Sequence, residues 1–206
     1  MMLINFSLPP DERYKLENLL FLGHIPGPDQ PKDVDSFLEP LIAEFEVLQH
    51  GITAYNALQD EEFLLRAHII AVGADSRGRE KVLHNTGTGS YRYCPYCTAY
   101  GIQTDTVYCP FTKPTNEPPP GKSVHEAFEN IHFQTPPIRN DTDWRNIAEH
   151  LEQYPQDKDF VFSTGIKGHS IFHKLSSIIF PLSFPIDAMH VFYEGVILQI
   201  FNHQRG

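Results

Sequence analysis

Apolar runs separated by proline- and glycine-containing turns organise the first 75 residues. Residues 2–8 and 17–25 are two such runs, each stopped by a proline-containing turn, which predicts two strands. Over residues 37–48 the apolar positions recur at helical spacing, which predicts a helix capped by Asp35 or Ser36. Residues 63–72 are mostly apolar and predict a strand buried on both faces. This order of elements is typical of part of an α/β core.

The periodicity is lost over residues 76–160, which hold all three cysteines and a proline-rich segment at residues 110–120. Two short helices are predicted there, at residues 123–131 and 142–154. After this insertion the core resumes, with a last strand approached over residues 178–187 and a helix from about Met189. The predicted organisation is a first core part at 1–75, an insertion with a possible zinc site at 76–160, and the last core strand with the start of the following helix at 161–206.

Composition narrows the class of protein. A chain of 206 residues with 41% hydrophobic residues fits one domain, or one domain with a large insertion, and excludes wholesale disorder. The net charge of −10 argues against a free-standing nucleic-acid binder, but it suits a metal-dependent nuclease core that takes its DNA affinity from basic flanking domains. There is no bilayer-spanning apolar run and no secretion signal, so we expect an intracellular protein without a membrane partner or a disulfide framework.

The segment at residues 184–196 carries three proton-handling or metal-binding groups, Asp187, His190 and Glu194. In a helix their spacing places them on one face. The alternative is an amphipathic helix whose apolar residues face inward while these polar groups are solvated. Glu194 is assigned to the helix surface.

A second candidate site is the Cys94-Pro95-Tyr96-Cys97 turn, a potential zinc half-site with Cys109 as a third thiolate. The nearest candidate for a fourth ligand is His84, with His125 and His132 further along the chain. A reduced, partly buried cysteine pair is an equal alternative.

Tyrosines are concentrated around these cysteines, at positions 91, 93, 96, 100 and 108. Aromatic rings of this kind can stack on bases. Since Arg92 is almost the only basic residue among them, packing of a small, loop-rich subdomain is the favoured interpretation.

Motifs in order along nearly the whole chain resemble those of CACTA-type (En/Spm-like) DNA transposases, and fungal members especially. The C-terminal pieces are Gly-Ile-Lys-Gly-His-Ser at 165–170 and Phe-Pro-Leu-Ser-Phe-Pro-x-Asp-x-Met-His at 180–190. The N-terminal pieces lie at residues 8–18, 23–28 and 35–41, and include Gly-His-Ile-Pro-Gly-Pro. One departure is Thr88, which follows Thr-Gly where relatives carry a histidine before the Cys-x-x-Cys.

The resemblance implies an RNase H-like core in which carboxylates at strand ends converge on two Mg²⁺ or Mn²⁺ ions at the scissile phosphate. Asp75, after the third predicted strand, corresponds to the second carboxylate; a solvated turn aspartate is the alternative. Asp187 and His190 match an Asp-x-x-His element near the active centre. The implied partner is DNA at transposon ends, and the implied location is the nucleus.

The resemblance also places a first catalytic aspartate before Met1 and a last glutamate beyond Gly206. We therefore expect an incomplete RNase H-like core: a truncated fragment of a DDE/D-type cut-and-paste transposase, inactive alone. One alternative is a non-catalytic, zinc-stabilised binding module derived from a transposon. Another is a small hydrolase that uses Asp187 and His190, disfavoured because no nucleophile is placed beside them.

Overall fold

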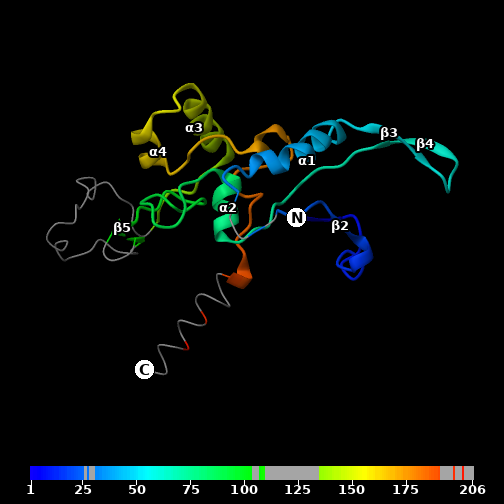
Figure 1. Ribbon diagram of the computed structural model, residues 1–206, viewed down its shortest axis with the longest axis horizontal. Helices are drawn as coiled ribbons and strands as arrows, with labels where there is room; N and C mark the ends of the chain where they lie inside the picture. Colours follow the sequence, from blue (N-terminus) through cyan, green and yellow to red (C-terminus); the bar gives the residue numbers. More distant parts are fainter. Residues whose placement is uncertain are drawn as a thin grey trace.

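The computed structural model describes residues 1–25, 27, 31–103, 107–109, 135–190, 197 and 201. Within these residues, helices and long connections surround one apolar core, and the strands form three separate two-stranded antiparallel sheets (Figure 1). The strands are β1 (Met2–Ile4), β2 (Leu19–Phe21), β3 (Ile52–Asn56), β4 (Glu61–Leu65), β5 (Ile102–Gln103) and β6 (Val107–Tyr108). The helices are η1 (Leu16–Asn18), α1 (Asp35–Leu48), α2 (Ser76–Leu83), α3 (Asp141–Gln153), α4 (Lys158–Thr164) and η3 (Ile171–Lys174).

The two N-terminal strands and the helix after them confirm the sequence pattern. β1 pairs with β2 in antiparallel register, with Ile4 opposite Leu19, although both strands are shorter than the apolar runs. Helix α1 turns Leu38, Ile42 and Phe45 toward the core, which explains their helical spacing. The helix begins at Asp35 itself, so neither predicted cap occupies the N-cap position.

The prediction of a buried strand over residues 63–72 is wrong. The strand β4 ends at Leu65 and is exposed along its whole length, with Phe63 43% and Leu64 55% exposed. It pairs with β3 in a hairpin that extends away from the helices (Figure 1). A hairpin needs only a short loop to close, whereas central-strand pairing needs distant partners. Residues 66–74 then run back toward α2 outside any strand.

The second half of the chain contributes α3 and α4. Helix α3 confirms the predicted helix at 142–154, with Asn140 as the N-cap accepting a 2.9 Å hydrogen bond from the Asp143 amide. Helix α4 is capped by Asp157 and ends at Gly165 in the left-handed conformation. The proline-rich segment and the helix predicted at 123–131 lie outside the described residues.

The core joins α1, α2 and α3 to residues 166–184. Its centre is an aromatic stack in which Phe180 lies 6.0 Å from Trp144 and 5.4 Å from Phe184, ring centroid to centroid. The last core strand expected near residues 178–187 is not formed. The chain makes tight turns there, such as the 2.8 Å bond from the Ser183 amide to the Ile179 carbonyl. A strand would place residues four apart on one face but about 13 Å from each other, so the 5.4 Å separation of the Phe180 and Phe184 rings requires the chain to turn.

No helix in the described part of the chain has the length and apolar character that crossing a membrane requires.

Candidate functional site

Asp75 lies at the start of a helix. Its Oδ1 accepts a 2.6 Å hydrogen bond from the Gly78 amide, which makes it the N-cap of α2. The sequence placed it after a strand, and that placement is wrong because the strand has ended ten residues earlier, at Leu65. The carboxylate is exposed, so a second role beside capping is sterically open to it.

Asp187 and His190 contact each other, as their three-residue spacing predicts. The His190 Nδ1 donates to Asp187 Oδ2 at 2.6 Å, and Asp187 Oδ1 accepts the Met189 amide at 2.9 Å. The hydrogen bond from His190 holds the pKa of the Asp187 carboxyl below its usual value. Burial opposes this effect, and the backbone amides of His190 and Met189 add smaller lowering contributions. The pair is therefore a charged, oriented carboxylate–imidazole unit at the start of a helical segment. Glu194 lies outside the described residues.

Two hydrogen bonds join residues on either side of Asp75 to residues that precede Asp187. The Val72 amide donates to the Ser183 carbonyl at 2.7 Å, and Arg79 Nη1 donates to the Pro185 carbonyl at 3.4 Å. These donors flank Asp75 in the sequence, and the acceptors directly precede Asp187. The two candidate acidic segments therefore lie side by side.

The Cys-x-x-Cys turn brings two thiols together. The Sγ atoms of Cys94 and Cys97 are 3.3 Å apart, while two sulfurs on one tetrahedral zinc ion would be about 3.8 Å apart from Zn–S bonds of about 2.3 Å. The two thiols are therefore close enough to each other for a small side-chain rotation to bring both onto one ion. Burial raises the pKa of Cys97 to about 11, against a backbone hydrogen bond that lowers it, and the neighbouring Cys94 thiol raises it further.

Cys109 lies near this pair, where its thiol hydrogen-bonds the Tyr93 side chain, and burial raises the pKa of Cys109. Burial and the same contact raise the pKa of Tyr93 to about 12. His84 is directed elsewhere: it ends α2 in the left-handed conformation and its Nε2 lies 3.1 Å from Asp35 Oδ2. Among the described residues no group of three or more His, Cys, Asp or Glu side chains is arranged to hold a metal ion. His125 and His132 lie outside them.

Tyr96, between the two cysteines, connects the turn to the segment before Asp187. Its hydroxyl donates to the Phe184 carbonyl, and the Arg79 guanidinium lies over its ring at 5.7 Å. Sequence reasoning missed this contact because the two partners are 88 residues apart. The only signal was the position of Tyr96 inside the candidate metal turn.

Arg139 fixes the same turn from the other side. Its Nε donates to the Cys97 carbonyl at 3.1 Å and its Nη2 to the Thr164 carbonyl at 2.6 Å. The side chain is buried, and burial lowers its pKa. A buried guanidinium that satisfies two carbonyls holds the cysteine turn against the end of α4. Nothing in the sequence marked it.

Residues 1–109 match the family model described as transposase family tnp2. The match spans 109 of the 206 residues, more than half, so the chain belongs to this transposase family. Membership implies DNA as the partner on which the family acts. Asp75 and the three cysteines lie inside the matched range, whereas Asp187 and His190 lie outside it. No curated protein and no solved structure matches the chain.

Proposed function

We propose that this chain is part of a CACTA-type (En/Spm-like) transposase similar to fungal members, which cleaves DNA at transposon ends and transfers the freed strand in the nucleus. In this proposal Asp75 and the Asp187–His190 pair belong to one active centre, built on an RNase H-like core. The observation that supports it most is the adjacency of the two acidic segments through the Val72–Ser183 and Arg79–Pro185 hydrogen bonds.

The described residues do not by themselves fit a two-metal centre. Carboxylate oxygens are the ligands that Mg²⁺ and Mn²⁺ prefer, and Asp75 and Asp187 offer them. However, both Asp187 oxygens already accept hydrogen bonds, and Asp75 Oδ1 caps a helix. A working centre therefore requires further carboxylates, and we expect no cleavage from the described residues alone. The chain's own contribution is to hold an ionised, histidine-oriented carboxylate beside a helix start.

Binding of Mn²⁺ to the full chain, followed by electron paramagnetic resonance, tests the shared centre. Asp75→Asn removes the charge but keeps a good N-cap, because asparagine caps as well as aspartate. We expect Asp75→Asn and Asp187→Asn each to weaken Mn²⁺ binding. Asp157→Asn is the matched control, because Asp157 is also an N-cap aspartate and accepts the Phe160 amide at 3.0 Å. Equal Mn²⁺ binding by all three variants and the parent would refute the assignment.

The alternative function is a non-catalytic binding module stabilised by zinc. Its support is the 3.3 Å pair of thiols in a turn that Arg139 and Tyr96 tie to the core. Metal binding by such a turn adds directly to folding stability. A chain that holds zinc but shows no Asp75-dependent Mn²⁺ binding would favour this function over the first.

Elemental analysis of the purified chain tests the zinc proposal and its ligands. We expect close to one zinc per chain, lost in Cys97→Ser. His84→Asn should keep the metal, because the structure pairs His84 with Asp35. Loss of zinc in His84→Asn would restore His84 to the ligand set, and absence of zinc from the unmodified chain would leave the cysteines as ordinary buried thiols.

A further inference from the structure

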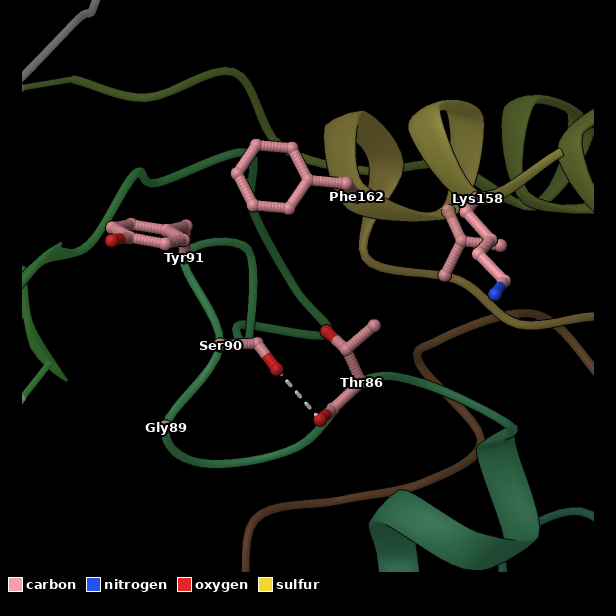
Figure 2. Close-up of a pocket in the computed structure, with 7 residues that line it drawn as sticks. Thr86, Gly89, Ser90, Tyr91, Lys158 and Phe162 are labelled. Carbon is pink, nitrogen blue, oxygen red and sulfur yellow. Dashed lines mark hydrogen bonds between the residues drawn. The ribbon is translucent and has the colours of Figure 1, made fainter. Parts of the chain in front are cut away.

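An open cavity of about 330 Å³ lies between the loop at residues 86–91 and helix α4 (Figure 2). Its size is at the lower end of the range for small-molecule sites. The loop contributes one wall and α4 the other. The lining residues are Thr86, Gly89, Ser90, Tyr91, Lys158, Val161 and Phe162.

The chemistry of this lining differs from that of the chain as a whole. The chain carries 26 acidic and 16 basic residues, yet none of the seven lining residues is acidic and one, Lys158, is basic. The others include two aromatic rings, those of Tyr91 and Phe162, and three hydroxyl groups, those of Thr86, Ser90 and Tyr91. This combination suits a ligand with a flat aromatic part and an anionic part.

A line of aromatic contacts leads from the interior into the cavity. The Arg92 guanidinium lies 4.7 Å over the ring of Tyr100, and Tyr100 stacks on Tyr91 at 5.4 Å with an interplanar angle of 22°. Tyr91 then meets Phe162 edge to face, again at 5.4 Å. Tyr100 is only 6% exposed, whereas Phe162 is 42% exposed. Tyr100 is thus fixed by packing, and Phe162 is exposed enough to present aromatic surface to the cavity.

The loop wall is held in place by its own hydrogen bonds. The Ser90 hydroxyl donates to the Thr86 carbonyl at 2.9 Å, as Figure 2 shows, and the Ser90 amide donates to the Gly87 carbonyl at 3.2 Å. The Thr86 amide donates to the carbonyl of Gly165, the residue that ends α4, at 2.9 Å. This last bond ties the loop to the helix. The two walls are therefore fixed relative to each other before any ligand enters, which lowers the entropic cost of binding.

We propose that this cavity binds one unpaired nucleotide of a DNA strand, with the base against Phe162 and Tyr91 and its phosphate beside Lys158. The choice of DNA rests on the proposed transposase function; the cavity itself is separate from the Asp187–His190 segment. Stacking on an aromatic ring accepts any base, so the site reads no sequence. A base inside a duplex presents no free face to a ring, so the nucleotide must be single-stranded or extruded.

The test compares three probes on the full chain: a duplex with a three-nucleotide overhang containing 2-aminopurine, the same duplex without the overhang, and free dAMP. Anisotropy gives the affinities, and 2-aminopurine quenching reports stacking. We expect the overhang to bind more tightly than the blunt duplex. Phe162→Ala should weaken overhang binding by about tenfold and remove the quenching. Phe162→Leu, which keeps apolar volume without a flat ring, should behave in the same way.

Matched variants separate the cavity from general effects. Phe63→Ala removes a phenylalanine of nearly equal exposure, 43%, on the distant strand β4 and should change nothing. Lys158→Gln should reduce the dependence of log affinity on log salt by about 0.7, the value for one phosphate contact on a single strand. Lys167→Gln, at another exposed lysine, should leave this slope unchanged.

Equal overhang affinity in Phe162→Leu and the parent would overturn the proposal, as would an equal loss in Phe63→Ala. Binding of dAMP as tightly as the overhang would assign the cavity to a free nucleotide and overturn the DNA strand as ligand. Failure of the proposed active centre is a different result: Mn²⁺ binding would be insensitive to Asp75→Asn while the Phe162-dependent preference for the overhang persisted.

Discussion

Removing the Tyr96 hydroxyl should loosen the segment that precedes Asp187. In Tyr96→Phe the ring stays under the Arg79 guanidinium, so the cation–π contact is retained and only the hydrogen bond to the Phe184 carbonyl is lost. The change therefore isolates one contact between the cysteine turn and the candidate active segment.

The expected loss of stability depends on how far this hydrogen bond is buried. A neutral hydrogen bond contributes about 0.5–1.5 kcal/mol net, and a buried carbonyl left without a partner costs about 1–3 kcal/mol. Tyr96 is half-buried, so water can replace part of the lost bond. We therefore expect a loss of about 1 kcal/mol, which in a chain of this size lowers Tm by about 2–4 °C.

Urea unfolding and amide exchange together measure the effect. The Val72 amide is the local reporter, since it donates to the Ser183 carbonyl, and its exchange should rise about fivefold. The Thr86 amide, bonded to Gly165, should show less local effect. Tyr154→Phe is the control, because Tyr154 is 58% exposed and its hydroxyl can be solvated. Unchanged stability together with unchanged Val72 exchange would refute the role of Tyr96.

Two further predictions concern α4 and the imidazole pair beside η3. Gly165→Ala should destabilise the chain by about 2 kcal/mol in a urea titration, because φ is 75° and a Cβ would overlap the Arg92 carbonyl. Gly73→Ala is the control: a Cβ there would meet nothing within 4 Å, so its effect on stability should be close to zero. Burial, then the nearby His173, lowers the pKa of His169 below 6.5, so the unfolded state binds more protons and stability should fall as pH decreases through 6.5. His169→Gln should reduce this pH dependence of the urea midpoint; an identical dependence in the variant would contradict it.

Patterns within a few residues predicted the helices and contacts that form between residues close together in the sequence. Helix α1 was predicted from apolar residues at helical spacing, and α3 was predicted within one residue of its observed bounds. The contact between Asp187 and His190 and the approach of Cys94 to Cys97 also follow from spacing within a few residues. Each of these depends on neighbours along the chain, so one sequence is enough to find it.

Apolar runs were less informative, because hydrophobicity alone does not say what covers a segment. Residues 63–72 divide between an exposed hairpin strand and an extended connection, and residues 178–184 bury Phe180 and Phe184 through turns rather than a strand. The residues that fix the candidate site were also missed. Arg79 and Arg139 act on backbone carbonyls far away in sequence, and no side-chain pattern reveals which carbonyls need a donor.

The candidate site belongs to both halves of the chain. Asp187 and His190 lie outside the residues that match the transposase family, yet their segment is held by residues inside that range. Val72 bonds Ser183, Tyr96 bonds Phe184 and Arg79 bonds Pro185, three successive carbonyls that lead directly to Asp187. Because Tyr96 sits between Cys94 and Cys97, a change in the geometry of that turn would act on the second of these carbonyls, that of Phe184. The cysteine turn is therefore tied, through Tyr96, to the segment that carries the Asp187–His190 pair.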